Sequence, residues 1–246
     1  MFFKRLRWEQ LLFWRNREAA VFVFIFPPLL YLLLGAVYSN DIDGLPAADV
    51  LLAGLIGYGC ANTAFAGLAI TQVIRRENGS LKRLRATPLP MTTYFSATVV
   101  STLLVFALQM LTTLALGVVL YGAHAPKRPL EIALLVVFGG LAFAGLGFGA
   151  AALIRSAEGA SAVVNLAVLP MAFLSGSFGP TRHYPEFLQK ISELLPLTYY
   201  NRLLKHAYLL DRSIFNDPKS IAVVAAWGLA GYLLAWRRFG WSPRER

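Results

Sequence analysis

Ser175 is the residue of this chain whose surroundings most resemble those of a catalytic nucleophile, because it lies in an apolar region within the sequence LSGS. A serine nucleophile needs a base, most often a histidine, to accept its proton. The three histidines, His124, His183 and His206, lie outside the apolar stretches. An enzyme that uses Ser175 is therefore a weak hypothesis.

Other kinds of chemistry have even less support in the sequence. No cluster of His, Cys, Asp and Glu has the spacing of a metal site, and the single cysteine, Cys60, excludes a disulfide within the chain. The nucleotide-binding pattern G-x-x-x-x-G-K-[ST] does not occur. We expect a chain with no metal, no cofactor and no catalytic site of its own.

The apolar stretches predict the fold class. Charged residues make up 15% of the 246 residues, against about 25% in soluble domains. A helix that crosses the hydrocarbon core of a bilayer needs about 20 mostly apolar residues. Six stretches without Asp, Glu, Lys or Arg approach or exceed this length: 19–38, 50–74, 92–122, 132–154, 159–176 and 220–236. The sequence predicts an all-α integral membrane protein with six transmembrane helices, in a single domain over 1–246.

The basic residues indicate the orientation. The net charge is +10, from 23 Lys and Arg against 13 Asp and Glu, and 15 of the 23 fall in residues 4–17, residues 75–85, Arg155 and the tail from Arg237. Short loops rich in Lys and Arg stay in the cytoplasm. We therefore expect both termini on the cytoplasmic side of the cell (inner) membrane. Nucleic-acid binding is disfavoured, because the basic residues are dispersed.

The predicted spans contain no Asp, Glu, Lys, Arg or His. Ion-coupled carriers usually bind their driving ion at an acid or base within the membrane, so this absence argues against a self-sufficient secondary carrier. Small residues are frequent instead, and Gly145 and Gly149 form a GxxxG pattern in the fourth span. Such residues let two helices approach closely. We favour packing within the chain over a contact between two copies.

Two segments near the cytoplasmic side have helical patterns. Residues 1–18 mix apolar and basic side chains, which favours a helix in the membrane interface over a frayed terminus. Residues 75–90 form a compact, charged connection. Asn78 or Ser80 could cap a short helix there, and Pro88 could end it.

The connection over 177–219, between the last two spans, is much longer than a turn. Apolar residues from Tyr184 to Leu195 follow i, i+3, i+4, i+7 spacing, which predicts an amphipathic helix closed by Pro196. A second segment, Leu197–Leu210, is rich in Tyr and Leu. We expect these segments either to enter the membrane and return or to lie on its surface, where aromatic residues are common.

These connections, in this order on six spans, resemble those of the permease subunit of the ABC-2 type transporter family, in its drug-export form. The sequence RENGSLKRLRATPL over 76–89 resembles the coupling-helix region of that family. The sequences FLSGSFGP over 173–180 and LLPLTYY over 194–200 resemble its late outer motif. The resemblance covers nearly the whole chain.

The resemblance implies a half-channel in the lipid bilayer that works as a dimer, with a second copy or with a sister permease. Separate ABC ATPase subunits would bind ATP and Mg²⁺ and provide the energy for export, so this chain would not be an enzyme. An ion-coupled carrier and a membrane-embedded enzyme are the alternatives. The fold alone does not specify the substrate, which could be a drug, a lipid, a glycan or a peptide.

The resemblance also implies two sets of functional residues. Coupling to the ATPase would involve ten consecutive residues: Arg76, Glu77, Asn78, Gly79, Ser80, Leu81, Lys82, Arg83, Leu84 and Arg85. The outer helices would form a lid over the pathway, and six residues are candidates for an outer gate: Phe178, Phe187, Leu188, Ile191, Tyr199 and Tyr200.

Overall fold

The computed structural model describes residues 1–38, 41–42, 44–182 and 184–242. His183 and the basic residues Arg244 and Arg246 therefore lie outside the described residues. Within the described part the chain is mainly helical, and its only β-type pairing is an isolated bridge between Ile42 and Leu45.

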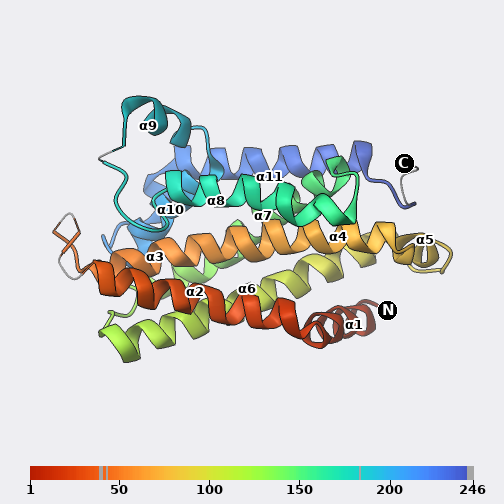
Figure 1. Ribbon diagram of the computed structural model, residues 1–246, viewed down its shortest axis with the longest axis horizontal. Coiled ribbons are helices and arrows are strands. Elements are labelled where there is room, and N and C mark those ends of the chain that lie inside the picture. The colour runs from red at the N-terminus through yellow and green to blue at the C-terminus, as the bar shows by residue number, and fades with distance from the viewer. Residues whose placement is uncertain (39–40, 43, 183, 243–246) are drawn as a thin grey trace.

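Six helical elements of the described chain are long and apolar enough to cross a membrane. They are α2 (Arg17–Val37), the composite Ala47–Glu77, α6 (Met91–Tyr121), α7 (Pro129–Leu153), α8 (Ala157–Leu174) and α11 (Pro218–Arg238). Figure 1 shows them side by side along the long axis of the molecule, with the short helices gathered at its two ends. The prediction of an all-α membrane protein with six spans is confirmed.

Several helices extend beyond the uncharged stretches. The second span begins at Ala47 and ends at Glu77, so the helix also carries Asp49, Arg75, Arg76 and Glu77, outside the uncharged stretch 50–74. The predicted bounds of this span are therefore too narrow at both ends. Each of these four side chains has polar partners, described below, and such partners offset the cost of burying a charge.

The second span lies at the centre of the bundle and is almost entirely buried. It consists of α3 (Ala47–Cys60), a π-helical segment η1 (Ala61–Gly67) and α4 (Leu68–Glu77). The wider turn of η1 packs against Gly147 of α7, where a Cβ atom would lie 2.9 Å from the carbonyl oxygen of Phe65. The lack of a side chain at Gly147 therefore makes room for the π-helix, a form that is frequent at functional sites.

α7 and α11 are in close contact along a row of glycines. A Cβ atom at Gly149 would lie 2.9 Å from the carbonyl oxygen of Gly231, and one at Gly145 would overlap with the carbonyl oxygen of Gly228. Lipid provides no hydrophobic drive between helices, so close backbone approach is the main source of their attraction. The GxxxG pattern packs within the chain, as predicted.

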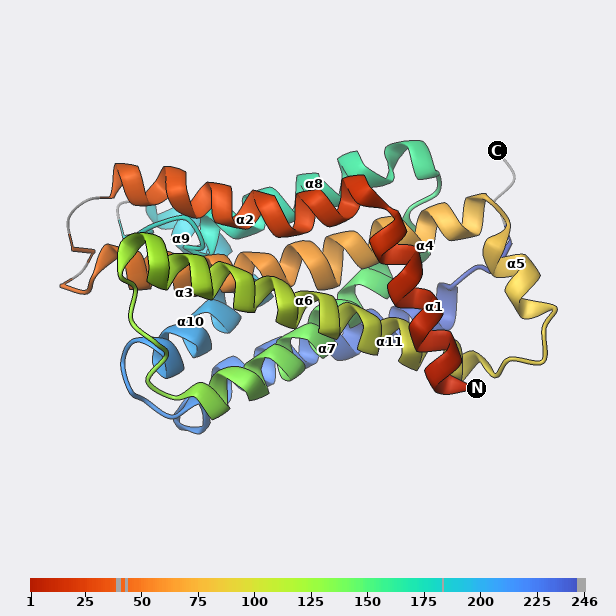
Figure 2. The same ribbon diagram turned by 90° about the horizontal axis from the view of Figure 1, so that it is seen from below.

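α1 (Phe2–Arg15) crosses the end of the bundle at a steep angle to α2, as Figure 2 shows. The chain turns at Asn16, whose side-chain oxygen accepts a hydrogen bond from the Ala19 amide at 3.2 Å and so caps α2. Phe3 and Trp8 are exposed, whereas Glu9 is buried. A helix is thus present where the sequence predicts an interfacial one, and its contact with lipid stays a prediction.

At the opposite end lie α9 (Glu186–Ser192), α10 (Pro196–Tyr208) and the 3₁₀ turn η2 (Ile214–Asn216). The helix predicted from Tyr184 to Leu195 is shortened to the seven residues of α9, because the residue before a proline avoids helical backbone, and Leu195 is extended. α10 packs against α3, α7 and α11. It therefore lies within the bundle and not on its surface.

Candidate coupling and gating sites

The predicted coupling segment contains a short helix beyond the end of α4. α5 (Ser80–Arg85) follows the turn at Asn78 and Gly79, and Figure 2 shows it at the same end of the molecule as α1. Gly79 has a φ of 72°, a left-handed conformation that glycine adopts without strain. The Asn78 side chain accepts a hydrogen bond from the Ser80 amide at 3.0 Å. The helix ends at Arg85, ahead of Pro88.

α5 has one apolar face and one basic face. Leu81 is 1% exposed and attaches the helix to the protein, and Leu84 is half-buried. Lys82, Arg83 and Arg85 are exposed. This arrangement leaves three cationic side chains available to a binding partner while a leucine holds the helix in place.

Arg76 is the one coupling candidate with a buried guanidinium. It donates hydrogen bonds to the carbonyl oxygens of Ala151 (2.8 Å) and Ile154 (2.6 Å), at the end of α7, and to that of Arg155 (3.3 Å). Cations are favourable at the C-terminus of a helix, where carbonyl groups lack intrahelical partners. Arg76 also pairs with Glu77, at 3.4 Å. It therefore joins the coupling segment to α7 and is not a surface contact.

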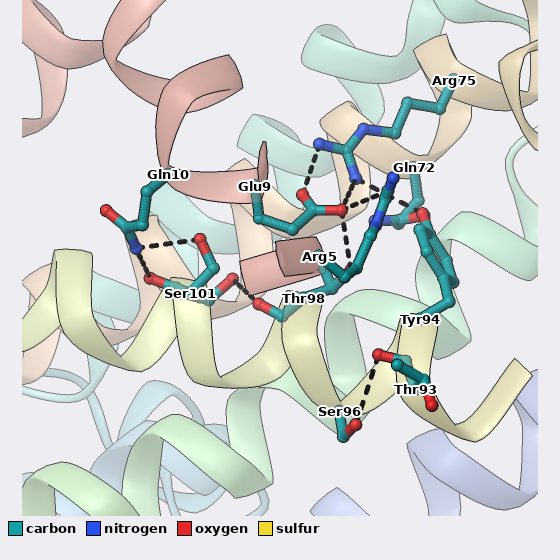
Figure 3. A network of polar contacts seen from close by, with 11 residues as sticks. Arg5, Glu9, Gln10, Gln72, Arg75, Thr93, Tyr94, Ser96, Thr98 and Ser101 are labelled. Carbon is teal, nitrogen blue, oxygen red and sulfur yellow. Dashed lines mark hydrogen bonds and ion pairs between the residues drawn. The ribbon is translucent and has the colours of Figure 1, made fainter. Parts of the chain in front are cut away.

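Glu9 of α1 forms the centre of a second polar network, shown in Figure 3. Its carboxylate makes a bidentate pair with Arg75 of α4, at 2.7 and 3.1 Å. Arg5 also pairs with it, and the Thr98 hydroxyl of α6 donates to it at 3.4 Å. The network continues because the Tyr94 hydroxyl lies 3.4 Å from Arg75 Nη1.

Two further contacts extend this network. The Tyr94 hydroxyl donates to Gln72 Oε1 at 2.5 Å, and Gln10 Nε2 donates to both the carbonyl and the hydroxyl oxygen of Ser101 at 3.0 Å. α1 is thus fixed to α4 and α6 by side chains that sequence reasoning missed. The available signal was that Glu9 is the single carboxylate among the basic residues of 1–17.

The six gate candidates fall into two groups. Phe187 and Ile191 of α9 are exposed, at 62% and 42%, and Leu188 is half-buried beside them. Tyr199 and Tyr200 of α10 are buried. The structure therefore does not bring the six residues together on one face.

The buried candidates have defined partners. The Tyr200 hydroxyl donates to the Leu135 carbonyl of α7 at 3.0 Å, and the Tyr199 hydroxyl donates to the Glu193 carbonyl at 2.8 Å. Phe178 lies with its ring centre 5.1 Å from that of Tyr58 on α3. Tyr200 thus contacts α7, Phe178 contacts α3, and Tyr199 contacts the connection after α9, so helix and loop packing accounts for their burial.

Ser175 lies in the turn after α8. Its hydroxyl forms a hydrogen bond of 2.9 Å with the Thr198 hydroxyl, which is not a base. Asn201 of α10 donates from Nδ2 to the Ser175 carbonyl (3.0 Å) and to the Ser177 hydroxyl (2.9 Å). The contacts of this turn hold α10 against the end of α8, and they give no support to a serine nucleophile.

Ion pairs fasten the connections at the α9 and α10 end. Asp49, which is buried, accepts hydrogen bonds from the backbone amide of His124 and pairs with its Nδ1, both at 2.8 Å. Arg128 donates at 2.9 Å to Glu131 and to Asp211. These two hydrogen bonds raise the pKa of Arg128, so the side chain stays charged. The sequence placed Asp49 in a loop, whereas it belongs to the first turn of α3.

The environment of His206 on α10 disfavours its charged form, unlike that of Arg128. Its Nδ1 is buried and lacks a hydrogen-bond partner among the described residues. Burial has the largest effect and lowers the pKa of His206; Asp217 opposes it, and Arg212 and Arg202 make smaller contributions that also lower the pKa. The neutral imidazole is therefore the form that the fold favours.

Comparison with known proteins identifies the class. The sequence profile described as "ABC-2 type transporter" matches residues 2–209. The chain therefore belongs to the ABC-2 type transporter family and represents its membrane-spanning permease component.

Individual relatives agree with this class. The chain is 28% identical over 168 residues to the probable multidrug ABC transporter permease YbhR of Escherichia coli (strain K12), which covers 66% of this chain and 45% of YbhR. It is 24% identical over 223 residues to the putative transport permease YvfS of Bacillus subtilis (strain 168), covering 90% of this chain and 89% of YvfS. The chain thus spans less than half the length of YbhR and most of the length of YvfS.

Proposed function

We propose that this chain forms half of the membrane pathway of an ATP-driven exporter, as a dimer with a second copy or a sister permease. Separate ATPase subunits bind ATP and Mg²⁺ in this proposal, and the permease itself carries out no chemistry. Membership of the ABC-2 family supports it, and so do the names of the relatives, one of which is a probable multidrug permease. Multidrug export is accordingly the substrate class proposed here.

The observation that carries the proposal is the position of α5. It lies beyond the spans, at the end where α1 begins, and its Lys82, Arg83 and Arg85 are exposed at the surface of the protein. An ATPase with an acidic groove would bind this surface. Motion of the groove would then reach α7 through Arg76, whose guanidinium holds the end of that helix.

The proposed placement is in the cell membrane with both termini in the cytoplasm. The support is the charge distribution, since α5, the start of α1 and the end of α11 together carry eight Lys and Arg residues and lie at one end of the molecule. In this placement α9 is on the outer side, with Phe187 and Ile191 toward the water or the membrane surface.

Reversal of charge on α5 tests the coupling role. We expect Lys82→Glu combined with Arg85→Glu to reduce co-purification of the ATPase by about tenfold or more, because close charge pairs at interfaces contribute several kcal/mol. The matched control is Arg237→Glu with Arg238→Glu, which makes the same change at the same end of the molecule on α11.

The readouts are ATPase binding and ATP hydrolysis by the reconstituted complex, in preparations with equal membrane insertion. Equal binding by both double variants would contradict the coupling role of α5. Transport by the chain alone in liposomes, driven by an ion gradient without ATP, would overturn the proposed energy source.

A further inference from the structure

A cavity of about 260 Å³ lies between α1, α2, the second span and α6, next to the Glu9 network. Its wall combines apolar side chains, among them Leu12, Val23 and Val105, with hydroxyl and amide groups. Small-molecule sites usually have this composition, in which an apolar lining carries a few placed polar groups. The cavity takes a small molecule or part of one, and it is too small for a folded partner.

Two polar groups of the wall have no partner. Thr63 Oγ1 and Gln72 Nε2 are buried and form no hydrogen bond within the described part of the chain. Thr63 is 6% exposed and Gln72 is 1% exposed. Because the Tyr94 hydroxyl occupies Oε1 of Gln72, the free group of that amide is a donor. Buried polar groups are nearly always paired, so an acceptor from a ligand is the expected complement.

A second observation, independent of the unpaired groups, is that Thr63 lies in the π-helical segment η1. A π-helix gives up regular α-helical geometry, and such segments are frequent at functional sites. Here the wide turn places Thr63 and Gly67 on the cavity wall. The helix geometry and the unpaired groups therefore point to the same place.

The charges of the wall restrict the ligand. Glu9 and Arg75 both line the cavity as a bidentate pair, whereas Arg5, the second arginine that pairs with Glu9, lies outside the cavity wall. A charged ligand would have to compete with this pair or remain unpaired in a largely apolar cavity, which is costly. An uncharged ligand neither competes with the Glu9–Arg75 pair nor buries an unpaired charge. Leu12, at the cavity wall on α1, is also 45% exposed, so this part of the wall reaches the surface of the bundle.

We infer that this cavity binds an uncharged amphipathic molecule. Its polar end accepts a hydrogen bond from Gln72 and pairs with Thr63, and its apolar part lies along Leu12, Val23 and Val105. The inference rests on the proposed placement of the chain in a membrane and not on the direction of transport. A neutral lipid that stays bound and an uncharged amphiphile that is transported would both have such a polar end and such an apolar part.

The test uses the full chain, without an ATPase, in phosphatidylcholine nanodiscs. The probe is a monoacylglycerol with a diazirine in its acyl chain, and labelled peptides are identified by mass spectrometry. We expect saturable labelling of α1, η1 and α6. Thr63→Val removes only the hydroxyl and should weaken labelling by about threefold to tenfold. Thr63→Leu also fills the cavity and should weaken it by about tenfold or more.

Thr112→Val is the matched control, because Thr112 lies on α6 away from the cavity wall and donates to the Gln109 carbonyl of its own helix. It should label like the unaltered chain. A sulfonate and a quaternary ammonium analogue with the same chain should compete about tenfold less well than the monoacylglycerol.

Equal labelling of Thr63→Val, Thr63→Leu and Thr112→Val in monodisperse preparations would overturn the inference. So would labelling that does not saturate, or charged analogues that compete equally. In the assembled transporter, weaker labelling when light is applied during ATP hydrolysis would identify a transported molecule. Labelling that is unchanged by ATP hydrolysis would identify a resident lipid. Both of these last results support the site, and neither depends on the α5 experiment.

Discussion

Glu9 shows how one carboxylate can organise three helices. It is buried between Arg5 of its own helix, Arg75 of α4 and Thr98 of α6. An acidic residue in a basic, interfacial segment would be a minor surface feature if it faced solvent. Its burial makes it a structural link, since removal of one member leaves buried cations without a counter-charge.

We expect Glu9→Gln to lower stability by about 1–3 kcal/mol, because the amide replaces a charged acceptor that two arginines share. The measurement is the thermal unfolding of the purified chain in detergent, followed by circular dichroism. Glu18→Gln is the control, because Glu18 is exposed in the first turn of α2. A Glu9 variant as stable as the Glu18 variant would show that the network contributes little.

His206 predicts a dependence of stability on pH. Burial lowers its pKa in the folded chain, whereas in the unfolded chain it titrates near its ordinary value of about 6.5. Below that value the unfolded chain binds the proton more readily, so stability is full above about pH 6.5 and falls as the pH decreases. Unfolding midpoints at pH 7.5 and 5.5 should therefore differ more for the natural chain than for His206→Gln. Identical differences for the two proteins would refute this assignment.

At the scale of the elements, the glycine row between α7 and α11 predicts an intolerance to added volume. Gly149→Val should cost about 1–3 kcal/mol, since its side chain would meet the Gly231 backbone. Ala133→Val makes a similar change on the exposed face of α7 and should be tolerated. Thermal unfolding and the monodisperse fraction in gel filtration measure the difference. Comparable behaviour of the two variants would mean that α11 can move away at little cost.

The elements also show what a single sequence predicts. Uncharged stretches located all six spans, because burying unpaired charge in lipid is costly enough to leave a clear pattern. The helix ends were missed by a few residues, since Asp49 and Arg75 continue their helices with partners from other segments. Such partners depend on how helices face each other, which local periodicity does not encode.

The candidate sites were predictable to different degrees. Residues 76–85 were predicted from their resemblance to a known coupling region; Gly79 has the turn and Leu81 the burial of a short docked helix, and the coupling role stays a prediction. The six gate candidates came from the resemblance to the family's outer helices. That choice could not separate exposed Phe187 from buried Tyr200, because an amphipathic pattern does not distinguish a lipid surface from a protein interior.

At the scale of the whole molecule, the proposed orientation predicts different chemical access at the two ends. In a Cys60→Ala background, Phe187→Cys should react with a membrane-impermeant thiol reagent added to intact cells. Lys82→Cys should react only after permeabilisation. The Cys60→Ala replacement removes the single thiol of the chain, which is buried. Labelling of both positions from the same side would contradict the topology.

The neighbouring arginines of α4 have a consequence for how the molecule moves. Successive residues of a helix point about 100° apart, so Arg75 and Arg76 face different neighbours. Arg75 holds α1 through Glu9, and Arg76 holds the carbonyl end of α7. A rotation of α4 about its own axis would therefore shift both contacts at once, in directions about 100° apart. Two adjacent side chains would in this way carry a twist at one end of a single helix to α1 and to α7 together.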